Sequence, residues 1–85
     1  MAVLTNNSSE SVSVEILTDI GEYRTATIPA SESVRLNISG RDKQLWVLAT
    51  FANGRKLESE KLYVTSQGLV SSIITNKQVS ISYAL

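Results

Sequence analysis

The sequence predicts an all-β, antiparallel β-sandwich of seven to eight strands, in a single domain that spans residues 1–85. Apolar residues recur at every second position through most of the chain, which is the period of a strand with one buried face. Turn-forming residues separate these runs at a spacing of roughly 8–12 residues, which is typical of sandwiches and small barrels. No stretch shows sustained helical periodicity.

The alternation defines the expected strands in chain order. It is clearest at 33–39, where Val34, Leu36 and Ile38 share one face. The strand at 69–75 carries apolar residues on both faces, as a covered or oligomer-facing strand would. The full set of expected strands is 2–4, 11–19, 22–28, 33–39, 45–51, 61–64, 69–75 and 78–85.

Short clusters of Gly, Pro, Asn, Asp and Ser predict the turns between these strands, because such residues favour turn conformations. The predicted turns are Asn6-Asn7-Ser8, Asp19-Ile20-Gly21, Pro29-Ala30-Ser31, Ser39-Gly40-Arg41-Asp42, Asn53-Gly54, Ser66-Gln67-Gly68 and Asn76-Lys77.

The turn at Asn53-Gly54 allows two hairpin registers. A two-residue type I′ turn pairs Ala52 with Arg55 and sets apolar against charged residues on both faces. A three-residue loop with Gly54 in the left-handed conformation pairs Phe51 with Arg55 instead. This second register separates core from surface, and we favour it. Its expected core face carries Leu45, Val47, Ala49, Phe51, Leu57 and Tyr63, and its other face carries Trp46, Leu48, Thr50, Lys56, Glu58, Glu60 and Leu62.

The favoured register places the single tryptophan on a charged strand face, and this face is the candidate binding surface. An indole ring buries a large area and offers one N–H donor, so it suits a proline-containing peptide or a sugar ring. The alternative is that the strand is covered on both faces and the tryptophan belongs to a second core layer or a dimer contact. The candidate residues are Trp46, Leu48, Lys56, Glu58 and Glu60.

The composition argues against an enzyme. The chain has no histidine and no cysteine, so it lacks the residues of a Ser-His-Asp triad and of His- or Cys-ligated metal sites. Glu58 and Glu60 lie two residues apart, as a carboxylate pair could, but lysines nearby indicate a solvated surface. We therefore expect no catalytic residue, no cofactor and no metal ligand.

Charge and hydropathy restrict the partners and the compartment. Eight basic and eight acidic residues cancel, and no basic patch for nucleic acid is visible. The longest strictly apolar run is Leu45 to Ala49, far short of the roughly 20 residues of a membrane span. The absence of a signal-peptide pattern and of cysteine favours the cytoplasm. We expect a protein or peptide partner or a homo-oligomer, and neither nucleic acid nor membrane.

Several segments resemble the β domain of the von Hippel–Lindau family: NSSESVSVEIL (7–17), GE (21–22), IPA (28–30), QLWVL (44–48) and GRKLESEKLYV (54–64). The resemblance covers most of residues 7–65 and implies a transthyretin (prealbumin)-like sandwich, one of two expected types beside the immunoglobulin-like one. In that family a Trp, a Tyr, a Ser and a His bind a hydroxyproline-containing peptide. Trp46 matches the Trp, but Gln44 stands in place of the His and Ile16 near a second Trp. The resemblance therefore implies the scaffold and not the hydroxyproline site.

These features lead to one main functional hypothesis and two alternatives. The main hypothesis is a non-enzymatic binding or adaptor module that recognises a protein or peptide through the candidate face, or by pairing an exposed edge strand with its partner. The first alternative is a self-assembling structural subunit of a capsid, tail or pilus type, because zero net charge removes repulsion between copies. The second alternative is a carbohydrate-binding module.

Overall fold

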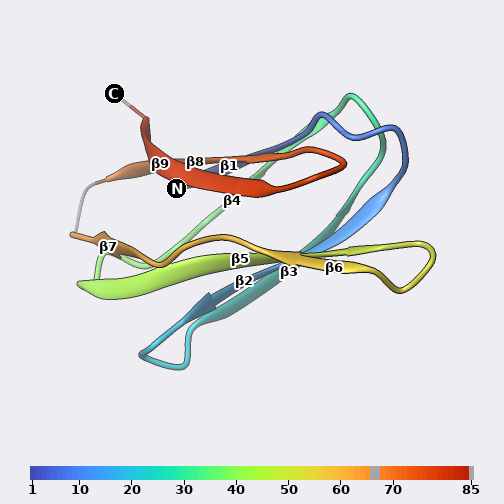
Figure 1. The fold of residues 1–85 in the computed structure, drawn as a ribbon. Coiled ribbons are helices and arrows are strands. Elements are labelled where there is room, and N and C mark those ends of the chain that lie inside the picture. Colours follow the sequence, from blue (N-terminus) through green and yellow to red (C-terminus); the bar gives the residue numbers. More distant parts are fainter. Residues whose placement is uncertain (66–67, 85) are drawn as a thin grey trace.

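The computed structural model describes residues 1–65 and 68–84, and it confirms the all-β prediction. Two sheets lie in two layers, and no helix occurs in the described ranges (Figure 1). The predicted turn at Ser66-Gln67 and the final residue, Leu85, lie outside the described residues.

Nine strands occur in the described part of the chain, against the seven to eight that the sequence predicts. Sheet A has the order β4-β1-β8-β9, and sheet B has the order β3-β2-β5-β6, with β7 also paired to β5. The strands are β1 (Ala2–Asn6), β2 (Val12–Thr18), β3 (Tyr23–Ile28), β4 (Ser33–Leu36), β5 (Lys43–Phe51), β6 (Lys56–Glu58), β7 (Leu62–Val64), β8 (Leu69–Ile74) and β9 (Val79–Ala84).

The expectation of purely antiparallel pairing is wrong for one pair of strands. β1 lies between β4 and β8, antiparallel to β4 but parallel to β8, with Ala2 opposite Val70. Alternation specifies which face of a strand is buried, but it carries no information on the direction of the neighbouring strand. Sheet A is therefore mixed, and the pairings within sheet B are antiparallel.

The inner faces of both sheets share one hydrophobic core. Sheet B supplies most of it through β2 and β5, which pair over seven residues from Val12 opposite Phe51 to Thr18 opposite Leu45. The buried apolar residues are Ala2, Leu4, Val12, Val14, Ile16, Ile28, Leu45, Val47, Ala49, Phe51, Val64, Val70, Ile74 and Val79. Their alternation in sequence is the observation from which the strands were predicted.

Asn6 is a fully buried polar residue that ties the end of β1 to the β1–β2 connection and to the end of β3. Its Nδ2 donates to the carbonyl oxygens of Glu10 and Ile28, each at 2.8 Å. Its Oδ1 accepts hydrogen bonds from the backbone N–H and the hydroxyl of Ser8, at 2.9 and 2.6 Å. A buried amide is stable only when such partners are present. Asn6 therefore fixes the path of the chain after the end of β1.

We expect Asn6→Asp to destabilise the fold by about 3 kcal/mol, because a carboxylate oxygen would replace the amide donor that faces two carbonyl oxygens. Urea unfolding followed by Trp46 fluorescence measures this change. Asn7→Asp is the matched control, since Asn7 is exposed and the substitution should change stability by less than about 0.5 kcal/mol. Equal effects of the two substitutions would contradict the role of Asn6.

Candidate functional site

The register of the Asn53-Gly54 hairpin is the one that the sequence favours. The Phe51 N–H donates to the Arg55 carbonyl at 2.8 Å, and the Gly54 N–H donates to the Phe51 carbonyl at 2.9 Å. Gly54 has a φ of 86°, the left-handed conformation that a residue with a Cβ rarely adopts. Leu48 then lies opposite Glu58, and Trp46 belongs to the outer face of sheet B as predicted.

A bulge at Glu60 and Lys61 changes the pairing beyond β6. The Ser59 N–H donates to the Val47 carbonyl, and the Val47 N–H donates to the Ser59 hydroxyl, both at 2.8 Å. Leu45, two positions from Val47, lies opposite Leu62, which is three positions from Ser59. The chain between β6 and β7 therefore has one extra residue. The Ser59 hydroxyl serves here as the acceptor that a backbone carbonyl would otherwise supply.

The bulge corrects two predicted positions. Leu62 was expected on the outer face, but it pairs with Leu45 and packs against the core. Tyr63 was expected on the core face, but it pairs with Gln44 and is 56% exposed. One extra residue exchanges the two faces of the strand that follows, and this accounts for both errors.

An aromatic and apolar surface runs across the outer face of sheet B. Leu17 of β2 pairs with Tyr23 on one side and with Trp46 on the other, so the three residues form one row. Lys61 completes the row, with its ammonium 4.8 Å from the centroid of the Trp46 ring. We define the outer aromatic face as Leu17, Tyr23, Trp46, Leu48 and Tyr63.

Two carboxylates flank Leu48 on this face. Leu48 lies between Glu15 of β2 and Glu58 of β6, and all three belong to the same row. Burial raises the pKa of the Tyr23 hydroxyl, and the charge of Glu15 and its hydrogen bond raise that pKa further. The one donor of the Tyr23 hydroxyl is therefore directed to the Glu15 carboxylate at the edge of the face.

The five predicted site residues gather along β5 and its hairpin partner. Trp46 and Leu48 are half-buried, and Lys56, Glu58 and Glu60 are exposed. Sequence reasoning missed Leu17, Tyr23 and Lys61 as neighbours of Trp46. Lys61 follows from the bulge, and the other two follow from the pairing of β2 with β5, which no local pattern specifies.

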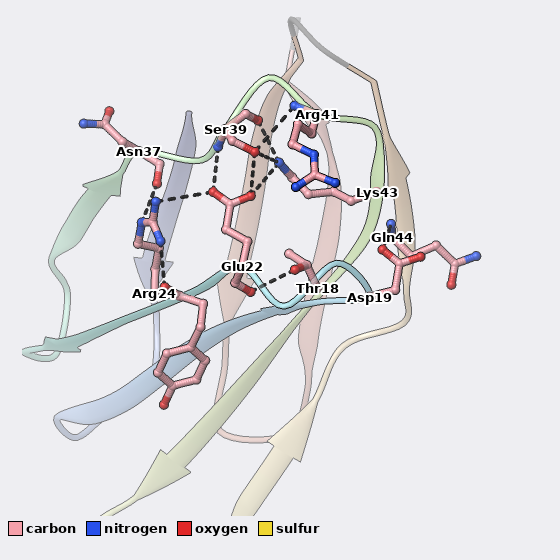
Figure 2. Close-up of polar contacts among 10 residues, drawn as sticks. Thr18, Asp19, Glu22, Arg24, Asn37, Ser39, Arg41, Lys43 and Gln44 are labelled. Atoms are coloured by element: carbon pink, nitrogen blue, oxygen red, sulfur yellow. Dashed lines mark hydrogen bonds and ion pairs between the residues drawn. The ribbon is translucent and has the colours of Figure 1, made fainter.

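A buried ion pair holds the loops at one end of the two sheets (Figure 2). The Lys43 side chain is fully buried, and its ammonium donates to Glu22 Oε1 at 2.8 Å, the Ser39 carbonyl at 2.7 Å and Ser39 Oγ at 2.9 Å. These three acceptors match the three donors of an ammonium. The Glu22 carboxylate also accepts the Ser39 N–H at 2.6 Å and lies 3.4 Å from Arg24.

The Lys43 cluster is structural, since every donor of the ammonium is used within the chain. It joins the β2–β3 turn to the segment between β4 and β5. Burial raises the pKa of Glu22, but the hydrogen bonds from Lys43 and from the Ser39 N–H and hydroxyl outweigh it and lower the pKa to about 2. The sequence held a signal for this site, because Lys43 continues the buried odd-numbered series of β5.

The Glu22 pKa predicts a loss of stability in acid. A carboxylate with a lowered folded-state pKa stabilises the fold above its unfolded pKa of about 4.5, and this contribution disappears as the pH falls towards about 2. We expect a contribution on the order of 1–2 kcal/mol at pH 6, after solvent screening at the edge of the cluster.

Urea unfolding of the wild type and of Glu22→Gln at several pH values tests this contribution. The wild type should be more stable at pH 6, and the difference should shrink as the pH falls from 5 to 2, since Gln does not titrate. Glu32→Gln is the control, because Glu32 is exposed and makes no ion pair in the described part of the chain. A difference that stays constant with pH would contradict the assignment.

Clusters of potential metal ligands and membrane-spanning helices are both absent from the described ranges. Residues 1–65 and 68–84 contain no group of three or more potential metal ligands among His, Cys, Asp and Glu. The same ranges contain no helix long and apolar enough to cross a membrane. In comparisons with known proteins, no family model, no curated protein and no solved structure matches the chain.

Proposed function

We propose that the protein is a non-enzymatic binding module that recognises a protein or peptide segment through the outer aromatic face. The supporting observation is that Trp46 and Leu48 lie at the centre of sheet B with their side chains only half-buried. No described segment lies on that side of sheet B (Figure 1). Apolar side chains in the middle of an uncovered sheet face are typical of an interaction surface.

Binding would gain its free energy from burial of Trp46 and Leu48. A half-buried Trp surrounded by polar residues has the arrangement of an interface hot spot. Glu15 and Glu58 on either side of Leu48 would favour a partner with basic side chains and set specificity more than affinity. The Lys61 ammonium lies over the Trp46 ring, so a partner that stacks on that ring face has to displace it.

The scaffold proposal is a sandwich of the prealbumin-like or immunoglobulin-like type. The two layers with a shared core support it. Ile16, near the position of the second Trp of the von Hippel–Lindau family, is only 1% exposed and belongs to the core. A side chain buried in this way is unable to contact a ligand, which is consistent with a different ligand from the hydroxyproline peptide.

The test uses peptides selected from a phage-displayed library of random nine-residue sequences against the wild-type protein. We expect Trp46→Ala to weaken binding of the selected peptides by about 30-fold or more, the loss typical of a hot-spot residue. Thr27→Ala is the matched control, because Thr27 is exposed at the far end of the same face, opposite Ser13. Selected peptides that bind both variants equally well would contradict the proposal.

Self-assembly is the second candidate, and exposed apolar residues on sheet A support it. Leu69 and Ile73 of β8 are 36% and 40% exposed and point away from the core. If this face joins copies, sedimentation velocity should show an oligomer that Ile73→Lys converts to a monomer. A wild-type monomer throughout the range of 1–100 μM, an ordinary window for weak to moderate affinities, would exclude this candidate.

A further inference from the structure

A groove separates the edges of the two sheets on the side of β6 and β9. It has a volume of about 410 Å³. Leu57, Val79 and Ile81 supply its apolar lining, and all three belong to the core or pack against it. The remaining lining residues are Glu58, Glu60, Lys77, Gln78 and Ser80. Apolar core side chains are therefore reachable from this edge of the molecule.

The backbone of β9 presents free hydrogen-bonding groups to this groove. The Thr75 N–H donates to the Gln78 carbonyl at 2.9 Å, which makes this pair the hydrogen-bonded start of the β8–β9 ladder. In an antiparallel ladder such pairs alternate, so Ser80 and Ser82 bond to β8 while Val79 and Ile81 direct their N–H and C=O groups outward. Within residues 1–65 and 68–84, these outward groups have no backbone partner.

β9 also lacks the features that protect the other sheet edges. β4 has only four residues and carries Arg35, and β3 carries Arg24. β6 has three residues, two of them charged, and is followed by the bulge. β9 has six residues, VSISYA, without a charge, a proline or a glycine. An edge strand of this kind readily pairs with another strand, and natural proteins usually blunt it.

Two contacts between the sheets bound the groove. At one end the Tyr83 hydroxyl donates to the Tyr63 carbonyl and accepts the Thr65 N–H. At the other end the Arg55 guanidinium donates to the Asn76 carbonyl at 2.7 Å. These contacts join the two layers at both ends of β9, and the length of β9 between them matches a short added strand.

Charge selects the partner. Glu58 and Glu60 line the groove, and Lys77 lines it next to Asn76, which Arg55 contacts. A second copy that paired its own β9 here by two-fold symmetry would bring the same glutamates of both copies to one junction. A basic side chain on a different chain would instead be attracted to them.

We propose that β9 accepts an extended strand from a partner protein, which carries alternating apolar residues and a Lys or Arg that faces Glu58 and Glu60. The added strand pairs with the outward groups of Val79 and Ile81 and extends sheet A by one strand. Its apolar side chains cover Leu57 and Ile81 in the groove. Glu58 borders both this groove and the outer aromatic face, but the added strand pairs with β9 and does not require Trp46.

The test selects phage-displayed nine-residue peptides on the Trp46→Ala protein, so that the outer aromatic face does not contribute. Ile81→Lys, which puts a charge into the groove, should weaken binding of the selected peptides at least about 10-fold. Ser82→Lys is the matched control, since Ser82 lies on the opposite face of the same strand and is exposed.

Amide hydrogen exchange of the Trp46→Ala protein gives a second readout that needs no further substitution. In the free protein the Val79 and Ile81 amides should exchange faster than those of Ser80 and Ser82, and a bound peptide should slow them at least about 10-fold. The proposal is overturned if no selected peptide protects these two amides, or if Ile81→Lys and Ser82→Lys bind equally. If the Trp46→Ala protein selects no binding peptide while the wild type does, this inference is overturned and the proposed function stays intact.

Discussion

The alternating burial of β5 is the constraint on which the rest of the structure depends. β5 is hydrogen-bonded to β2 on one side and to β6 and then β7 on the other, so its side chains can point only inward or outward. Leu45, Val47, Ala49 and Phe51 occupy the inner positions. Trp46 and Leu48 are therefore held on the outer face by the burial of their neighbours, and a slip of one residue would exchange the two sets.

The same alternation explains why a charged residue lies inside. Lys43 occupies the next inner position before Leu45, where its ammonium would be unstable without partners. Glu22 and Ser39 supply them from two connections that are far apart in the chain. The buried charge thus links these two connections, and the requirement for all three acceptors makes the arrangement specific.

The sequence predicts the local features well and the long-range ones poorly. The Asn53-Gly54 hairpin was predictable because turn chemistry and burial agree on one register. The bulge after Ser59 was not predictable, because a side-chain hydroxyl there replaces a backbone acceptor. The alternation of apolar and polar residues does not show where a strand contains an extra residue. The row of Tyr23, Leu17 and Trp46 depends on which strands become neighbours, and so does the parallel pairing of β1. The sequence therefore predicts the part of the candidate site on β5 and its hairpin partner, but not the part on β2 and β3.

The pairing of β1 with β8 also sets the order in which the layers can form. Sheet B is built from segments between residues 12 and 64, whereas the centre of sheet A joins Ala2–Asn6 to Leu69–Ile74. Contacts over such sequence separations form slowly, because the loop must close before they contribute. During synthesis on the ribosome, all the described strands of sheet B emerge before β8. Until β8 joins sheet A, the apolar inner face of sheet B is not fully buried. We expect the nascent chain to be most prone to aggregation in this interval.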